Sequence, residues 1–405
     1  MVADPVAVLV AARDEEGRIG STVRRLQESF PGTPVIVADD GSADGTAAEA
    51  EAAGARVLRL PARGKGQALT LAEREAPAGA LLLCDADVKG DLRPLARADA
   101  DLAVAAFERR IGGGFGVAKR TARAIIRLRA GVEVREPLSG QRLLSPAARE
   151  TSFPLAAGFG AETAMTTDAL RAGLVLEELD LDLDHRATGR DPLGFLHRGR
   201  QLRDLLLAAL APQATNFRGL RLPLVGAAFL LAQPVVTATG LADDLWSGPE
   251  RGFRAHLGAG RTTGVLKLVA IPAWALLRTR SLSGALLVAL SANLMNQLDT
   301  GPGRALKAYA VVSLALRRRP GRADGVAVLI APYDLREMAM LGDAGSNALG
   351  AVLGLSSVAR FTGRRRWSAI GALAFLTLVG EQRSLGALIE RTPVLRELDA
   401  WGREP

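Results

Sequence analysis

The sequence predicts an α/β N-terminal domain with a Rossmann-like, mostly parallel sheet, followed by an α-helical membrane domain. Three observations support this prediction. Short apolar runs alternate with helical stretches in the first half, and long uncharged runs occupy the second. The net charge of +8 is also uneven, because residues 1–218 hold 29 basic and 30 acidic residues, whereas residues 219–405 hold 22 and 13. We place the two domains at residues 1–210 and 219–405.

The first half predicts strands that alternate with helices, which is typical of parallel strands joined by crossover helices. The expected strands are Val6–Val10, Val35–Ala38, Arg56–Leu60 and Ala80–Leu83. The expected helices are Arg18–Ser29, Ala43–Ala53 and Gln67–Glu75.

The second half contains apolar runs that approach the length of a bilayer span. Leu222–Ala242 has 21 residues without a charge and Ser281–Leu298 has 18, and shorter runs follow. Arginine clusters at residues 317–319 and 364–366 suit anionic headgroups better than nucleic acid, because aromatic residues make up only 4% of the chain. We expect four to seven helices in the cell membrane, a cytoplasmic N-terminal domain and no nucleic-acid partner. A soluble all-α domain is the alternative.

Acidic residues gather where the predicted strands end. Asp39 and Asp40 follow one strand, and Asp85 and Asp87 follow another. Ligands of open parallel sheets bind at this edge, and two carboxylates there can hold a divalent ion that bridges a diphosphate. Lys65, flanked by glycines, is suited to reach a phosphate. Each motif alone also fits an ordinary turn or a solvated loop.

The ordered set of motifs resembles the inverting family 2 glycosyltransferases with the GT-A fold, over roughly residues 4–205. The motifs are AARDEE at 11–16, DDGSADGT at 39–46, GKGQAL at 64–69 and CDADV at 84–88. The resemblance extends to polyprenyl-phosphate sugar transferases and to glucosyl-phosphoglycerate synthases. It is similar to the latter through PLSG at 137–140, GFGAE at 158–162 and DHR at 184–186.

This resemblance implies a role for each matching residue. The nucleotide-sugar donor, a UDP-sugar, would contact Ala11, Ala12, Arg13, Glu16, Asp40, Lys65 and Asp85. Mg²⁺ or Mn²⁺ would be held by Asp85, Asp87 and His185, and Asp87 and Glu162 would be catalytic. Gly113, Gly114 and Lys119 would hold the acceptor phosphate.

The second half resembles the polyprenyl-phosphate sugar-1-phosphate transferases, which include the phospho-MurNAc-pentapeptide translocase. The matching residues are Asp243, Asp244, Asn293, Asn296, Asp299 and Asp343, with Lys267 at a basic loop position. The resemblance implies a second metal site at Asp243, Asp244, Asp299 and Asp343, with Asp343 catalytic. The histidine-rich late motif of that family has no counterpart, since no histidine follows His256. The domain is therefore either active or a degenerate anchor that binds membrane lipid and the acceptor.

The function expected from these resemblances is inverting transfer of a sugar from a UDP-sugar to a phosphate-bearing acceptor, most simply polyprenyl phosphate. The alternatives are a small acceptor such as 3-phosphoglycerate, activity in both domains, and a scaffold that binds only lipid or nucleotide.

Overall fold

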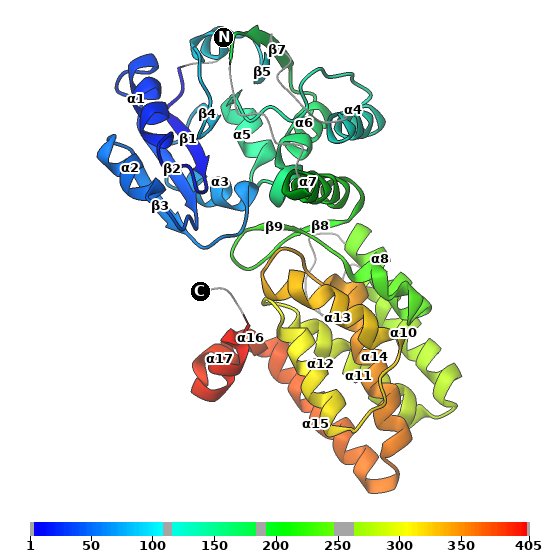
Figure 1. Cartoon of the computed structure of the whole chain (residues 1–405). Helices are drawn as coiled ribbons and strands as arrows, with labels where there is room; N and C mark the ends of the chain where they lie inside the picture. Colours follow the sequence, from blue (N-terminus) through cyan, green and yellow to red (C-terminus); the bar gives the residue numbers. More distant parts are fainter. Residues whose placement is uncertain (1–3, 108–115, 184–191, 247–262, 403–405) are drawn as a thin grey trace. The chain divides into compact units, whose positions relative to one another are not determined.

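The computed structural model describes residues 4–107, 116–183, 192–246 and 263–402 (Figure 1). The chain divides into two compact units. The N-terminal unit runs to Thr215 and also includes Gly219–Arg221, and the C-terminal unit comprises Asn216–Arg218 and the chain from Leu222 onward. The first is α/β and the second is helical, as the sequence predicts.

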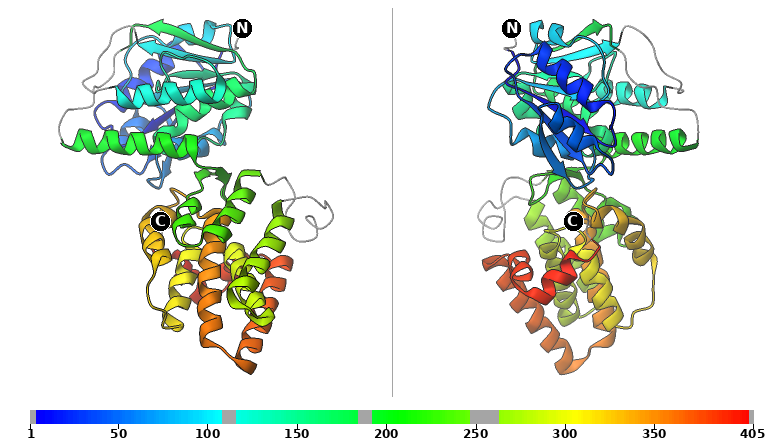
Figure 2. Two further views of the ribbon diagram at one scale, coloured as in Figure 1. Left: turned by 90° about the vertical axis from the view of Figure 1, so that its right-hand side faces the viewer. Right: turned by 60° about the vertical axis from the view of Figure 1, so that its left-hand side comes forward.

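A seven-stranded sheet forms the centre of the N-terminal unit, in the order β3-β2-β1-β4-β6-β5-β7 (Figures 1 and 2). The first four strands pair in parallel, and β6 is antiparallel to both of its neighbours. The mostly parallel sheet is thus confirmed. The strands are β1 (Ala7–Ala12), β2 (Val35–Asp40), β3 (Arg56–Leu60), β4 (Leu81–Asp85), β5 (Leu102–Phe107), β6 (Arg142–Leu144) and β7 (Leu176–Leu181).

Helices cover both faces of this sheet. They are α1 (Ile19–Ser29), α2 (Thr46–Ala52), α3 (Lys65–Glu73), α4 (Val117–Ala130), α5 (Pro146–Ser152), α6 (Ala161–Arg171) and α7 (Pro192–Leu210), with 3₁₀ turns η1 (Arg93–Arg97) and η2 (Gly158–Gly160). The predicted helix at Ala43–Ala53 begins three residues later, because residues 43–45 bond to a neighbouring loop instead. The predicted helix at Gln67–Glu75 begins earlier, so Lys65 is the first residue of α3 rather than part of a loop.

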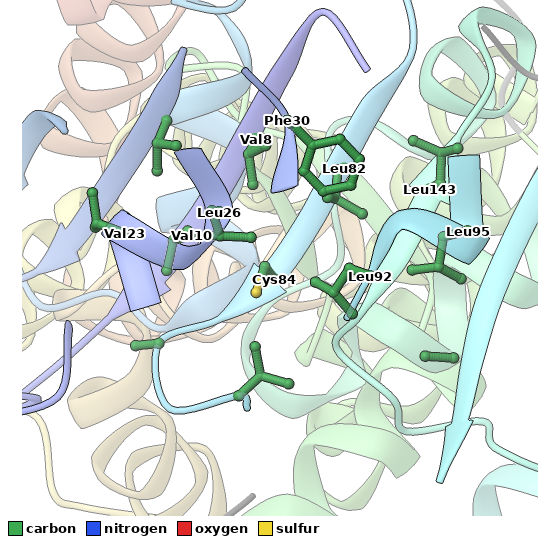
Figure 3. Close-up of a cluster of buried hydrophobic side chains, with 14 of the residues drawn as sticks. Val8, Val10, Val23, Leu26, Phe30, Leu82, Cys84, Leu92, Leu95 and Leu143 are labelled. Atoms are coloured by element: carbon green, nitrogen blue, oxygen red, sulfur yellow. The ribbon is translucent and has the colours of Figure 1, made fainter. Parts of the chain in front are cut away.

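Alternate residues of the buried strands supply two separate cores, because successive side chains of a strand point to opposite faces. Val8 and Val10 of β1 pack with Val23 and Leu26 of α1 on one face (Figure 3). Leu9 of β1 packs on the other face, in the cluster that contains α3 and α6. Cys84 belongs to the first core, where burial raises the pKa of its thiol. Cys84 is thus part of the strand core.

The C-terminal unit consists of helices packed around α11 and α14 (Figure 1). After the short strands β8 (Gln213–Thr215) and β9 (Arg221–Pro223) the elements are η3 (Gly226–Leu231), α8 (Pro234–Trp246), α10 (Thr263–Thr279), α11 (Leu282–Leu298), α12 (Arg304–Ala315), α13 (Arg322–Leu335), α14 (Gly342–Arg360), α15 (Gly363–Gln382), α16 (Leu385–Arg391) and α17 (Pro393–Ala400). Glycines let α14 approach α11 closely, since a Cβ on Gly354 would lie 2.6 Å from Val288 Cα.

The predicted span Leu222–Ala242 is wrong as a single helix. It divides into the end of β9, the turn η3 and the first part of α8. Pro223 and Pro234 account for the breaks, because proline cannot donate a helical hydrogen bond and disfavours helix in the residue before it. By contrast, the run Ser281–Leu298 does form one helix, α11.

Within the described ranges, no single helix combines the length and apolar composition needed to cross a bilayer. The bent pair α15 and α16, which meet at 91°, reaches that length and composition together.

Candidate functional site

The carboxyl ends of β1, β2 and β4 bring the predicted site residues to one edge of the sheet. In the strand register Ala12 lies opposite Asp39, and Ala11 lies opposite Asp85. Ala11 and Ala12 therefore lie between two groups of acidic side chains, one at the end of β2 and one at the end of β4. This edge is where open parallel sheets bind their ligands.

Two loops at this edge are fastened to each other by carboxylates that accept backbone hydrogen bonds. Asp14 accepts from the N–H of Ala43 at 2.9 Å, and Glu16 accepts from that of Gly45 at 3.0 Å. In return, Asp44 accepts from the N–H of Glu16 at 3.2 Å. Glu16, which we expected to contact the nucleotide, thus holds the loop after β1 against the loop after β2.

Asp40 is 5% exposed and shapes the turn that leads into α3. It accepts hydrogen bonds from the N–H groups of Arg63 at 2.7 Å and Gly64 at 2.9 Å, and its second oxygen lies 3.8 Å from the Arg13 guanidinium. Burial raises the pKa of Asp40 above its ordinary value, although these donors act in the opposite direction. Gly64 adopts a φ of 95°, which favours glycine.

Lys65 joins two carboxylates that are distant in sequence. Its ammonium lies 2.5 Å from Asp85 Oδ1 and 2.7 Å from Glu162 Oε1. Burial alone lowers the pKa of Lys65, but the two carboxylates outweigh it and raise that pKa above its usual value. Lys65 therefore stays charged at physiological pH, and the sheet edge contains a fixed cation at the N-terminus of α3.

The second oxygen of Asp85 accepts a hydrogen bond of 2.9 Å from Gln141. Gly140 permits this approach, because a Cβ there would overlap the Asp85 carboxylate. Neither residue was among the predicted site residues. Gly140 is the last residue of the PLSG motif and directly precedes Gln141, whose amide side chain is buried. This glycine is the feature of the sequence that could have pointed to the contact.

A fully buried arginine supports the segment that carries Gly140 and Gln141. Arg142 donates to the carbonyls of Ser139 at 2.6 Å and Pro137 at 3.0 Å, and to the hydroxyl of Thr166 at 2.7 Å. Burial lowers the pKa of Arg142 to about 10, so it remains charged at neutral pH. The bond to Thr166 fixes the segment to α6, the helix that carries Glu162, and the other two bonds hold the chain at Pro137 and Ser139.

Asp87 lies just beyond β4 and is half-buried. Thr22 donates to the carbonyl of Ala86 at 2.8 Å and so fixes the backbone between the two aspartates. The third predicted metal ligand, His185, lies outside the described residues. In the part of the chain that the structure describes, no three histidine, cysteine or acidic side chains converge to hold a metal ion.

The predicted acceptor-phosphate residues fall in two places. Gly113 and Gly114 lie outside the described residues. Lys119, on α4, forms an ion pair with Glu136, which directly precedes the segment held by Arg142. The N–H of Glu136 in turn donates to Glu178 of β7 at 2.6 Å. The structure thus connects Lys119 to the segment that carries Gly140 and Gln141.

The acids of the C-terminal unit gather around one lysine. Lys267 lies 2.6 Å from Asp243 and also pairs with Asp343. Asp244 accepts from the N–H groups of Asp343 at 2.9 Å and Ala344 at 3.0 Å, so it caps the start of α14.

Burial raises the pKa of Asp343 to about 7. Burial also raises that of Asp299, at the end of α11, well above its ordinary value. The second metal site stays a prediction.

Comparison with known proteins connects the N-terminal geometry to a family. The family model described as "Glycosyl transferase family 2" matches residues 7–129. A glucosyl-3-phosphoglycerate synthase of Mycolicibacterium paratuberculosis is 31% identical over 231 residues, which are 48% of this chain and 69% of the synthase. This chain belongs to glycosyl transferase family 2. It is a glycosyltransferase.

Two further proteins are similar to this family 2 glycosyltransferase. Protein RfbJ of Shigella flexneri is 30% identical over 82 residues, which are 20% of this chain and 64% of that protein. A glucosyl-3-phosphoglycerate synthase of Mycobacterium tuberculosis, solved with Mn²⁺, UDP-glucose and phosphoglyceric acid, is 26% identical with a TM-score of 0.42. That match covers 54% of this chain and 86% of the synthase chain.

We expect Gly140→Ala to abolish most of the transferase activity without unfolding the N-terminal unit. The added methyl group displaces the Asp85 carboxylate and so breaks the contacts of Asp85 with Lys65 and Gln141. The measurement is the rate of nucleoside diphosphate release, with thermal unfolding as the check on folding. Gly199→Ala is the matched control, because a Cβ on Gly199 meets no atom within 4 Å. Equal rates in both variants would contradict the role given to Gly140.

We expect Lys65→Met to lower the free energy of unfolding by about 1–3 kcal/mol, because it leaves Glu162 buried without its cation. Adding Glu162→Gln in the same chain should restore much of that loss but none of the activity. Thermal unfolding and product formation are measured on the single and double variants. Lys89→Met is the control, because Lys89 is an exposed lysine a few residues beyond β4. A double variant no more stable than Lys65→Met would show that the Lys65–Glu162 pair has no such effect.

Proposed function

We propose that this glycosyltransferase moves a sugar from a UDP-sugar to a phosphate-bearing acceptor, with inversion and with Mg²⁺ or Mn²⁺. The observation that carries the proposal is the Lys65 ammonium held between Asp85 and Glu162 at the carboxyl edge of the sheet. A fixed cation at the start of a helix suits a diphosphate, since both the lysine and the helix N-terminus favour negative charge.

The donor nucleotide is assigned to the part of the sheet edge that carries Ala11, Arg13 and Asp40. Asp40 is prearranged by two backbone N–H donors, so its orientation is set before any ligand binds. The fastened loops after β1 and β2 hold this edge rigid. The related glucosyl-3-phosphoglycerate synthase, whose structure was solved with UDP-glucose, supports the choice of a UDP-sugar.

The residues present fit a divalent metal that is held jointly with the donor. Asp85 bonds to Lys65 and Gln141, and Asp87, two residues further along and just beyond β4, is the carboxylate that we assign to the metal together with Asp85. Mg²⁺ commonly binds through one or two carboxylates together with substrate phosphates. When bound, the metal ion would supply positive charge that stabilises the leaving diphosphate. The structures of the related synthases with Mn²⁺ or Mg²⁺ support this assignment.

In the transfer, an acceptor oxygen forms a bond to the anomeric carbon, and the bond from that carbon to the diphosphate breaks. The electron pair leaves with UDP. A phosphate oxygen is already anionic and needs no base, whereas a hydroxyl group must lose a proton. Glu162 is the described carboxylate placed to accept that proton, and Lys65 holds it in position.

Two acceptors fit a phosphate-bearing class. The similarity to glucosyl-3-phosphoglycerate synthase favours 3-phosphoglycerate. The surface of the C-terminal unit favours polyprenyl phosphate, because 27 of the 33 large apolar side chains that are exposed in the described residues belong to that unit. So much exposed apolar surface is typical of membrane contact. We therefore propose that the C-terminal unit associates with the cell membrane and that the N-terminal unit acts in the cytoplasm.

Replacing Asp87 by Asn should lower UDP release by at least about 100-fold and raise the metal concentration needed for half-maximal rate. The carboxylate is lost, while the shape of the residue is kept. Asp91→Asn is the control, since Asp91 is exposed in the same connection and pairs with Arg93, two residues away. A metal requirement that is the same in both variants would refute the assignment of Asp87.

Glu162→Gln separates the two acceptors by their chemistry. With 3-phosphoglycerate, whose hydroxyl attacks, we expect a loss of about 10²–10⁴-fold in the rate of UDP release. With a short-chain polyprenyl phosphate we expect a loss below about tenfold, because no proton has to be removed. The exposed Glu150→Gln variant is the control. UDP release with neither acceptor in the unsubstituted enzyme would overturn the proposed acceptor class.

A further inference from the structure

Two turns of the C-terminal unit, one between α10 and α11 and one between α14 and α15, are fixed beside each other by an arginine. Arg366, in the first turn of α15, donates to the carbonyl oxygens of Val358 and Phe361 at 2.9 Å each. It also donates to Ser283 Oγ, in the first turn of α11, at 3.3 Å. This one side chain therefore closes the end of α14 and holds the start of α15 against the start of α11.

Five more arginines lie in or next to these two turns, and we call them the arginine patch. They are Arg278, Arg280, Arg360, Arg364 and Arg365. All five are exposed, and none forms an ion pair with a residue that the structure describes. The neighbouring sequence supplies no acid, because residues 251–298 and 344–380 contain neither aspartate nor glutamate. Within the described ranges, ion pairs therefore do not neutralise the positive charge of the patch.

Helix stability explains only part of this patch. A cation favours the C-terminal end of a helix, which suits Arg278 in the last turn of α10 and Arg360 in that of α14. Arg364 and Arg365, however, lie in the first turn of α15, where the positive end of the helix dipole disfavours cations. Nearby like charges also repel each other. Two arginines thus stand where they destabilise the fold, and an external anion would offset that cost.

Large apolar side chains are exposed next to the same arginines. Leu277 and Leu282, on either side of the first turn, are each 79% exposed, and Trp367 of α15 is 60% exposed. Nucleic acid would attract the arginines but offers no apolar phase to the two leucines. A bilayer surface offers both, since headgroup phosphates accept hydrogen bonds from arginine while leucine and tryptophan enter the acyl boundary. The combination therefore favours a lipid surface.

We propose that the arginine patch, together with Leu277, Leu282 and Trp367, docks the protein on a membrane surface that contains anionic lipid. This inference rests on the membrane association put forward for the C-terminal unit and deepens it. It names the docking residues and the charge of the lipid. The phosphates of the lipid headgroups supply the anions that the exposed arginines lack in the described structure.

The test is co-sedimentation of the full-length protein with two kinds of vesicle, phosphatidylcholine alone and phosphatidylcholine mixed with phosphatidylglycerol. Each arginine near an anionic surface strengthens binding about fivefold. We therefore expect binding to the mixed vesicles to be tighter by at least about tenfold, and the difference to shrink as salt is added.

Two triple variants that remove the same charge separate the patch from the net charge. The first removes arginines of the patch by Arg278→Gln, Arg364→Gln and Arg365→Gln. The second, the control, removes exposed arginines at and beyond the other end of α15 by Arg383→Gln, Arg391→Gln and Arg396→Gln. We expect the first to weaken binding to the mixed vesicles by at least about tenfold, without a lower thermal stability, and the control to keep most of the affinity.

The outcomes distinguish this inference from the membrane association on which it rests. Equal affinity for both kinds of vesicle, or an equal loss in both triple variants, would overturn the arginine patch as the docking surface while binding to phosphatidylcholine still supported membrane association. Binding to neither kind of vesicle would refute both. A short RNA duplex that binds more tightly than the mixed vesicles, and depends on the same arginines, would assign the patch to nucleic acid instead.

Discussion

The ammonium of Lys65 is the contact on which the arrangement of the sheet edge depends. Asp85 ends β4 and Glu162 lies in the first turn of α6, so Lys65 contacts two acids from separate elements. Without a cation between them their charges would repel in a region of low dielectric. Lys65 stands at the start of α3, where Gly64 turns the chain and Asp40 holds that turn by two backbone bonds. The side chain of Lys65 therefore links strand β4, helix α6 and the loop that precedes α3.

Much of the N-terminal unit follows from short-range patterns. Buried parallel strands are continuous apolar runs, so β1 and β4 could be located from the sequence alone. The acids after them had to meet, because parallel strands end at the same edge. What the sequence does not contain is the pairing of side chains across long separations. The contact of Lys65 with Glu162, and the bond from Gln141 to Asp85, depend on the packing of α6 and on the antiparallel strand β6.

The elements of the C-terminal unit were harder to predict from the sequence than those of the N-terminal unit. Its helical class is evident from the apolar runs, and α11 follows the run Ser281–Leu298. The boundaries of its helices could not be predicted as well, because a hydropathy average takes no account of the prolines that interrupt helices. Leu222–Ala242 contains Pro223 and Pro234, and the chain there changes from strand to turn to helix. The pairing of Lys267 with Asp343 joins residues that are 76 positions apart, and no local pattern encodes it.

Because Gly219–Arg221 belongs to the N-terminal unit, a fragment produced to contain that unit alone must include these residues. Arg221 forms an ion pair with Asp168 of α6 at 2.6 Å, and the carbonyl of Gly219 accepts a hydrogen bond from Arg74. A fragment that stops at residue 210 loses both contacts and leaves Asp168, on the same helix as Glu162, without its guanidinium. The shortest expression fragment that keeps both contacts therefore ends at Arg221.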